Sequence, residues 1–399
     1  MSVRPAAEAL AVVELGSLGF DRGGHLLVER ALGRVGVGEA LEVRGRDPHL
    51  GLHLRAWCRG RGHELIRSDV VMRKAVADGR WAGAQRAGGP GTDGLVAHPP
   101  ASWGVAARGA LLEQGAPPLS GCDLDRRDEV WTDLAPKLYA QALAGQWDPA
   151  TAVDWSQGDP LAPEVEAAVV QLMTYLVENE QTALVVPARF LGRIHPHFRE
   201  VMQFLAVQVA DEARHMEVFT RRALLNGSEM ATSGAGGRAS LQTLVTEPEY
   251  SVASFLLSVL GEGTFLHLLS FLERYAPDGV TRQICRLALG DEARHVAFGQ
   301  AHLEHRMSVD PTLRDRLRAA VHRRHDALAA TSGLSSDVFD ALVVLAAGDW
   351  APDAIGRGWD RVMSLQGEMD EGRQRRLVRL GFESGEAQEL SQLHTRNFM

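Results

Sequence analysis

The pentapeptide Asp-Glu-Ala-Arg-His occurs twice in this chain, at residues 211–215 and again at residues 291–295. Each copy lies within an amphipathic helical pattern. Residues three positions apart lie on the same face of a helix, so Glu212 lies beside His215 and Glu292 beside His295. Each copy therefore presents one carboxylate and one imidazole together, and the pair of copies predicts a site for two metal ions, with half contributed by each helix.

Two metal ions need more ligands than these four side chains, and a further glutamate precedes each copy. Glu180 precedes Glu212 by 32 residues, and Glu262 precedes Glu292 by 30 residues. Both lie on apolar helical stripes, whereas the rival Glu178 shares its stripe with polar residues and is expected to face solvent or to lie behind the ligands. The predicted metal ligands, which are also the predicted catalytic residues, are Glu180, Glu212, His215, Glu262, Glu292 and His295.

Burial explains why a metal is expected at these residues. Carboxylates on apolar stripes are costly to bury unless they are paired or bound to a cation, and four of them together would repel one another. The alternative is that each motif is only a solvated helix face, which is the usual reading of a single acidic motif with a histidine. The duplication on apolar stripes favours the metal site.

At these residues the chain resembles the ferritin-like di-iron carboxylate proteins, over roughly residues 165–306. The form Asp-Glu-x-Arg-His looks most like the oxygen-activating oxidases and monooxygenases, which include multicomponent hydroxylases, ribonucleotide reductase small subunits and amine N-oxygenases. The resemblance implies a mainly α fold, a four-helix bundle with extra helices. It also implies two Fe ions as cofactor, with Fe/Mn possible, and O2 as co-substrate.

The same resemblance implies roles for the charged residues around the ligands. Asp291 would accept the outer ring N–H of His215, and Asp211 that of His295. Arg214 and Arg294 would hold the two aspartates. The alternative is that all four are ordinary charges on a helix surface.

The chain is predicted to contain a small α/β domain over residues 1–84, a Gly/Pro-rich linker over 85–125 and a helical metal-binding domain over 126–399. The first domain resembles the TusA-type sulfur-carrier fold through Leu41-Glu42-Val43, Asp47-Pro48 and Gly62-His63-Glu64-Leu65. The family's persulfide cysteine would align near Asp21-Arg22, where this chain has no cysteine. A docking, gating or structural role is therefore expected for this domain.

The helical pattern predicts helices near residues 128–145, 162–186, 198–226, 249–276, 281–306 and 310–330, with more towards the C-terminus. His195 and His197 are expected in a turn and not at the site. The Gly/Ser-rich stretch 226–240 is expected to be a long crossover or a lid. Small residues near the second motif predict either a substrate cavity or tight helix packing there, namely Cys285, Ala288, Ala297 and Gly299.

The composition indicates which partners and which cellular compartment to expect. The net charge of −9 and the lack of a basic stripe argue against nucleic acid. The three cysteines are far apart in sequence, so a reducing cytoplasm is expected without a disulfide framework. We see no export signal, no run of 18 apolar residues and hence no membrane span in the sequence.

These features predict an O2-dependent non-haem di-iron oxidase or monooxygenase that oxidises a small organic molecule at C–H or at an amine nitrogen, in specialised metabolism. An external electron donor, a ferredoxin or a reductase, and a homodimer are expected with it. Phe219 occupies the position of the radical tyrosine of reductase subunits, and Ala288 replaces the third histidine of some N-oxygenases. The alternatives are a ferroxidase or peroxide-scavenging iron-handling protein without organic substrate and a non-catalytic binding scaffold.

Overall fold

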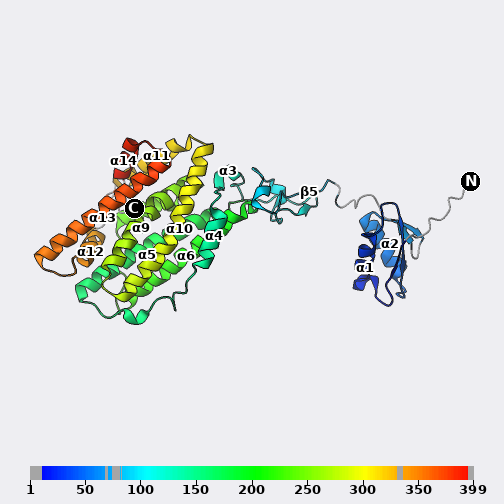
Figure 1. Ribbon diagram of the computed structural model, residues 1–399, viewed down its shortest axis with the longest axis horizontal. Coiled ribbons are helices and arrows are strands. Elements are labelled where there is room, and N and C mark those ends of the chain that lie inside the picture. The colour runs from blue at the N-terminus through cyan, green and yellow to red at the C-terminus, as the bar shows by residue number, and fades with distance from the viewer. Residues whose placement is uncertain (1–10, 68–70, 74–80, 82, 330–335, 394–399) are drawn as a thin grey trace, which may run out of the picture. The chain divides into compact units, whose positions relative to one another are not determined.

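The computed structural model describes residues 11–67, 71–73, 81, 83–329 and 336–393 (Figure 1). Its contacts divide the chain into two compact units. The first comprises Met1–Gly94 and Ser102–Pro118, and the second comprises Leu95–Ala101 and Leu119–Met399. Each unit has its own hydrophobic core.

The first unit contains a small α/β fold, as predicted. Its elements are β1 (Ala11–Glu14), α1 (Gly24–Leu32), β2 (Ala40–Arg44), α2 (Leu50–Arg61), β3 (Glu64–Arg67) and β4 (Val71–Arg73). The sheet order is β1-β2-β4-β3, with β1 and β2 parallel and the other pairs antiparallel. The helices bury Val28, Leu54 and Cys58 with Leu41 and Val43 of the sheet. The segment predicted as a linker also contains paired strands, β5 (Gln85–Arg86) and β6 (Leu111–Leu112).

The second unit is helical, which confirms the predicted fold class. Its helices are α3 (Arg127–Val130), α4 (Ala135–Ala144), α5 (Pro163–Leu191), α6 (Arg199–Leu224), α7 (Ala235–Val245), α8 (Tyr250–Ser254), α9 (Gly263–Tyr275), α10 (Gly279–Val309), α11 (Leu313–Ala329), α12 (Ser336–Ala347), α13 (Pro352–Arg379) and α14 (Ser384–Gln392). One predicted helix, 128–145, is divided into α3 and α4. Pro136 lies in the first turn of α4, and a proline has no N–H to continue a preceding helix.

Four long helices form the bundle. They are α5, α6, α10 and a continuous helix made of α8, a π-helical segment and α9. α5 packs on α6, α10 packs on α6 and on α9, and α12 and α13 cover α5 and α9 (Figure 1). The Gly/Ser-rich stretch before residue 240 is only partly irregular, because α7 begins at Ala235 and packs against α5.

The π-helical segment, Phe255–Glu262, is a local irregularity that the helical pattern does not predict. It ends at Glu262, which Gly261 and Gly263 flank, and glycine weakens a regular helix. The guanidinium of Arg376 donates to the carbonyl of Val259 at 2.7 Å and so satisfies part of the altered backbone. Single π turns inside α-helices are frequent at functional sites.

A buried ion-pair network sets α5, α6 and α10 against one another. Arg222 of α6 donates to Glu166 of α5 at 2.7 Å and to Asp278 at 2.9 Å. Asp278 also caps α10 by accepting from the backbone N–H of Thr281 at 2.7 Å. Because removal of one partner would leave buried charge uncompensated, this network fixes the register of the helices that carry the motifs.

The helix Tyr250–Tyr275 is long and apolar enough to cross a membrane, with a mean hydropathy of 1.6. The sequence expectation concerned an uninterrupted run of 18 apolar residues, and Glu262 interrupts such a run in this helix. However, 83% of its most apolar window is buried inside the protein, as in the core helix of a bundle, so length and composition are weak evidence for a span.

Candidate metal centre

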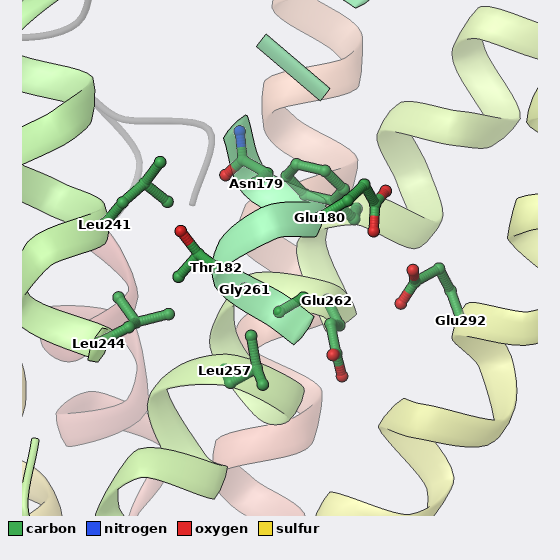
Figure 2. A pocket seen from close by; sticks show the side chains of 11 residues that line it. Asn179, Glu180, Thr182, Leu241, Leu244, Leu257, Gly261, Glu262 and Glu292 are labelled. Carbon is green, nitrogen blue, oxygen red and sulfur yellow. The ribbon is translucent and has the colours of Figure 1, made fainter. Parts of the chain in front are cut away.

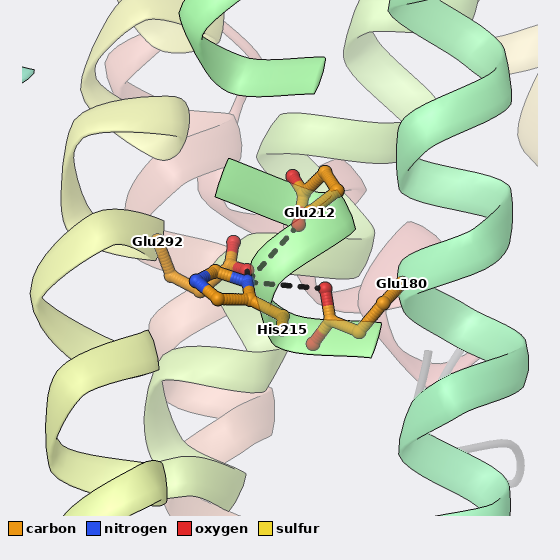
Figure 3. Close-up of side chains that lie close together, drawn as sticks. All are labelled: Glu180, Glu212, His215 and Glu292. Atoms are coloured by element: carbon orange, nitrogen blue, oxygen red, sulfur yellow. Dashed lines mark hydrogen bonds and ion pairs between the residues drawn. The ribbon is translucent and has the colours of Figure 1, made fainter. Parts of the chain in front are cut away.

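Six predicted side chains from four helices converge in the middle of the bundle. Glu180 comes from α5, Glu212 and His215 from α6, Glu262 from the end of the π-helical segment, and Glu292 and His295 from α10. All six are buried. Figure 3 shows Glu180, Glu212 and Glu292 directed at the ring of His215. The helical spacing brings each Glu/His pair to one face, and the bundle then brings the two faces together.

The six side chains form two overlapping sets of possible metal ligands. One set is Glu180, Glu212, His215 and Glu292, and the other is Glu212, Glu262, Glu292 and His295. Within each set the ligand atoms lie within 4.8 Å of one another. Glu212 and Glu292 belong to both sets, so these two carboxylates can bridge two neighbouring ions.

The carboxylate oxygens support this bridging role. Oε2 of Glu212 lies 3.2 Å from Nδ1 of His215, and its Oε1 lies 3.0 Å from Nδ1 of His295. Glu292 is arranged in the same way, with Oε1 at 3.4 Å from His215 and Oε2 at 3.4 Å from His295. Each of these two carboxylates therefore turns one oxygen towards each imidazole.

Several buried atoms at the centre have no hydrogen-bond partner in the described part of the chain. They are Oε1 of Glu180, Oε1 of Glu212, Oε2 of Glu262, Oε2 of Glu292 and Nδ1 of His295. Nδ1 of His295 and Oε1 of Glu212 are 3.0 Å apart, yet their geometry makes no hydrogen bond. Buried polar atoms are normally satisfied, so atoms directed at a common point fit a site for cations.

The electrostatics reflect four carboxyl groups enclosed together. Burial raises the pKa of Glu180 well above its ordinary value, and the charges of Glu292 and Glu212 raise it further. Burial and, after it, the negative charge of Glu292 likewise raise the pKa of Glu262. Burial alone would also raise the pKa of Glu212, but His295 and His215 lower it overall. Cations in the site would remove the repulsion that keeps protons on Glu180 and Glu262.

Each imidazole is oriented from behind by the aspartate of the opposite motif. Nε2 of His215 lies 3.2 Å from Asp291, and Nε2 of His295 lies 3.2 Å from Asp211. Burial would raise the pKa of Asp291, but hydrogen bonding and charge from His215 lower it to about 2, so this carboxylate accepts. The accepting aspartate fixes a ring N–H on Nε2 and leaves Nδ1 directed at the centre, which is the orientation that a metal-bound histidine requires.

The two arginines hold both aspartates. Arg214 lies 2.5 Å from Asp211 and 3.2 Å from Asp291, and Arg294 pairs with Asp291 and lies 3.8 Å from Asp211. Both guanidinium groups are largely buried. The structure therefore places these four residues behind the ligands and not on an open helix surface.

Three polar residues that were not predicted as site residues also contact the centre. Gln146 donates to Asp211 at 3.0 Å, and Trp147 donates through Nε1 to Asp291 at 2.8 Å. Gln208 donates to Glu262 at 3.0 Å. Gln146 and Trp147 follow α4, far from the motifs in sequence, where a tryptophan usually indicates packing alone. No periodic signal in the sequence links them to the site.

Replacing Trp147 with Phe should weaken metal binding by about tenfold, because Asp291 loses a donor and orients His215 less firmly. The affinity is measured by titrating manganese or ferrous iron into the metal-free chain. Trp155→Phe is the matched control, since the Trp155 ring donates to the carbonyl of Pro149 and to none of the site residues. Equal loss of affinity in both variants would assign the effect to packing.

A cavity adjoins the centre between α5, α7 and the π-helical segment (Figure 2). It is lined by Asn179, Glu180, Thr182, Ala183, Leu241, Leu244, Leu257, Gly261, Glu262, Phe265 and Glu292. Its volume of about 20 Å³ is enough for about one water molecule. Thr182 and Leu241 line both this cavity and an outer groove of about 410 Å³.

This cavity is not where the small residues of α10 suggested. Cys285 and Ala288 are fully buried in the apolar core, and a Cβ on Gly299 would lie 2.3 Å from Cβ of Ser258. The small residues therefore serve close helix packing, which was the alternative interpretation.

The remaining predicted positions lie outside the two ligand sets. Glu178 lines the outer groove. His195 accepts from the backbone N–H of His197 at 3.1 Å in the turn before α6, and His197 accepts from the backbone N–H of Val96 at 3.0 Å. Phe219 packs near His215, with 6.3 Å between ring centroids.

Fold and site together define a helical bundle with a buried carboxylate/histidine centre able to hold two metal ions. No family model matches the chain, and no curated protein matches it. Among solved structures, it is similar to an R2-like ligand-binding oxidase variant with an aerobically reconstituted Mn/Fe cofactor, at 17% identity and a TM-score of 0.41, covering 64% of this chain and 95% of that chain.

A second similar structure is a variant of an R2-like ligand-binding oxidase with an anaerobically reconstituted Mn/Fe cofactor. It is 18% identical, with a TM-score of 0.42, over 62% of this chain and 94% of that chain. At TM-scores this low the likeness supports no functional inference. The function proposed below rests on the geometry of the six side chains.

Proposed function

We propose that this protein is an O2-dependent non-haem oxidoreductase, an oxidase or monooxygenase that uses two metal ions to oxidise a small organic molecule. One observation carries the proposal: Glu212 and Glu292 each direct one oxygen to His215 and the other to His295. This arrangement suits two ions held side by side by shared carboxylates.

The donor set favours two irons, or one iron with manganese. It combines four carboxylates with two imidazoles and contains no thiolate, whereas zinc commonly takes thiolate or histidine in tetrahedral sites. When bound, such a pair supplies the electrons that reduce dioxygen and thereby oxidise an organic molecule. A monooxygenase reaction consumes two further electrons, so an external ferredoxin or reductase is part of the proposal.

The chain's own residues position the ions and keep water out. Asp291 and Asp211 hold the imidazoles in one tautomer. Phe204 stacks on Phe298 at 4.3 Å between ring centroids and meets His295 edge-on at 6.4 Å. This apolar wall limits water at the centre, which protects a reactive site from side reactions.

The cavity beside Glu180, Glu262 and Glu292 is the proposed inner end of the substrate site, which has room for about one water molecule and must widen to admit an organic molecule. Its other lining residues are mainly apolar, which favours an organic molecule over a hydrated ion. Leu241 and Thr182 line both this cavity and the outer groove, so a substrate enters when the Leu241 side chain moves aside. Leu241 is on α7, a short helix, and a shift of α7 would widen this passage.

The first unit has no assigned chemistry in this proposal. Its likeness to the TusA type stays a prediction. Burial raises the pKa of Cys58 to about 11, which disfavours a reactive thiolate. We therefore propose docking or support, and not sulfur transfer, for this unit.

Anaerobic loading of the full chain with ferrous iron, followed by a pulse of dioxygen, tests the proposal. We expect about two irons per chain and a rapid absorbance change as dioxygen is consumed. Glu180→Gln should reduce iron loading, whereas Glu178→Gln on the same helix should load normally because Glu178 lies in the outer groove.

The outcomes separate the alternatives. Failure of the full chain to take up iron would leave a helical scaffold and contradict the proposal. Dioxygen consumption that only oxidises added iron, with no product from any organic compound, would indicate an iron-handling protein.

A further inference from the structure

Helix α13 contributes a side chain to the π-helical segment that ends at Glu262. Nε of Arg376 donates to the carbonyl of Val259 at 2.7 Å. In a regular α-helix this carbonyl would accept from the N–H of Gly263, four residues further on. Here the N–H of Gly263 donates to the carbonyl of Ser258, five residues back, which is the π-helical pattern. Arg376 therefore occupies the place of the backbone donor that Val259 has lost.

Two glycines leave room for this guanidinium. A Cβ at Gly263 would overlap with Nε of Arg376, and a Cβ at Gly372 of α13 would lie 3.2 Å from its Nη1. Glycine allows such close approach because it carries no side chain. The guanidinium of Arg376 therefore lies directly against the backbone of the residue that follows Glu262.

The guanidinium has no carboxylate to compensate its burial. Burial, followed by the charges of Arg373 and Arg375, lowers the pKa of Arg376 to about 10. Its Nη2 has no hydrogen-bond partner among the described residues, and no carboxylate of those residues forms an ion pair with it. A buried cation is costly unless it makes strong hydrogen bonds. The carbonyl of Val259 is the acceptor that holds the guanidinium against the π-helical segment.

The next carbonyl of the segment also receives a side-chain donor. Oγ1 of Thr264 donates to the carbonyl of Leu260 at 2.6 Å. Nη1 of Arg373, one turn before Arg376 on α13, donates to this hydroxyl oxygen at 3.4 Å. The Nε of Arg373 donates to Ser391 of α14 at 3.0 Å. Side chains thus bond to two successive carbonyls of the segment, and α13 supports both.

The π-helical segment sets the direction of the Glu262 side chain. A π turn holds more residues than an α turn, so a return of residues 255–262 to α geometry would rotate Glu262 about the helix axis relative to α8. Gln208 of α6 donates to Oε1 of Glu262 at 3.0 Å. Glu262 belongs to one of the two ligand sets only, the set that contains His295. Rotation would break the bond to Gln208 and turn the carboxylate away from that set.

We infer that Arg376 is a positioning residue that holds Glu262 in the geometry of the metal position shared with His295. The inference rests on the proposed function, because it assumes a centre for two metal ions. The other position, with Glu180 and His215, does not include Glu262. Loss of the Arg376 guanidinium therefore weakens one of two neighbouring metal positions and leaves the other intact. General destabilisation of the bundle would weaken both.

The test is a titration of manganous ion into the metal-free full chain. Equilibrium dialysis gives the two dissociation constants, and electron paramagnetic resonance distinguishes an isolated ion from a magnetically coupled pair. The unsubstituted chain should bind about two ions per chain and show a coupled pair. Arg376→Met should bind one ion with unchanged affinity and the other at least about tenfold more weakly, so that the spectrum of an isolated ion persists to higher manganese concentration.

Three further variants assign the effect to the guanidinium. Gly263→Ala should produce the same split in affinity although Arg376 is still present, because the new Cβ displaces only the flexible end of that side chain. Arg376→Lys keeps a donor for the carbonyl of Val259 and should recover most of the affinity. Arg375→Met is the control, since the Arg375 side chain is 67% exposed and pairs with Glu371 at the surface.

The outcomes separate this inference from the proposed function. Equal weakening of both positions in Arg376→Met, or two unchanged affinities, would overturn the inference. If Arg376→Met lost its helical circular dichroism, Gly263→Ala would decide, and unchanged binding in that variant would likewise overturn it. An unsubstituted chain that binds no manganese would contradict the proposed function and this inference together, whereas two tightly bound ions in every variant would contradict this inference alone.

Discussion

Replacing Glu212 with Gln is expected to abolish specific binding of both metal ions. Glu212 belongs to both ligand sets, and its two oxygens face His215 at 3.2 Å and His295 at 3.0 Å. A neutral amide offers one weak oxygen donor in place of a bridging carboxylate, so neither ion keeps a complete ligand set. Iron per chain, measured after desalting an anaerobically loaded sample, should fall from about two to near zero.

The control for this prediction is Glu217→Gln, because Glu217 is on the same helix but exposed. This variant should bind about two irons per chain, as the unsubstituted chain is expected to do. If Glu212→Gln kept two irons per chain and consumed dioxygen at the usual rate, the bridging role of Glu212 would be wrong, and with it the two-ion geometry.

The second expected result is a large metal-dependent gain in thermal stability that increases with pH. A metal that binds only the folded state at 1,000 times its dissociation constant stabilises by about 4 kcal/mol. For a helical unit of this size that corresponds to a rise in Tm of roughly 10 °C. The measurement is the helical circular dichroism on heating, with and without ferrous or manganous ion.

The pH dependence follows from the groups whose pKa is raised in the folded, metal-free chain. Burial would lower the pKa of His215 and His295, but the surrounding carboxylates raise both well above 6.5. The pKa values of Glu180 and Glu262 are also raised. A group with a raised folded pKa contributes stability below its unfolded pKa and loses it as pH rises through the folded value.

The metal-free chain should therefore lose stability as pH rises above 6.5, while metal binding, which replaces these protons, becomes tighter. The gap in Tm between loaded and metal-free chains should widen over the same interval. Glu212→Gln should show no gap at any pH. A gap that narrows with rising pH would contradict the assignment of buried protons to this site.

The sequence was sufficient to select the six side chains that converge. Glu212 and His215, and likewise Glu292 and His295, are three residues apart, and helical geometry alone brings each pair to one face. Glu180 and Glu262 stood out because a carboxylate on an apolar stripe needs a partner. These are local regularities, so a single chain reveals them without knowledge of the contacts between helices.

The residues that complete the site depend on contacts between segments far apart in the chain. Trp147 reaches Asp291 across 144 residues, and no periodicity connects them. The π-helical turn before Glu262 is stabilised by Arg376, which is distant in sequence. The sequence left open whether the small residues near Ala288 line a cavity or allow tight packing, and only the packing of the helices decides between the two.

Helical periodicity and the cost of burying charge thus indicated the kind of centre, its six candidate ligands and the bundle that holds them. The tertiary structure decided which carboxylates belong to both ligand sets, which donors lie behind the imidazoles and where the cavity lies. The physical reason is range: backbone geometry acts over a few residues, whereas hydrogen bonds and packing between helices depend on how α5, α6, α7, α10 and α11 meet.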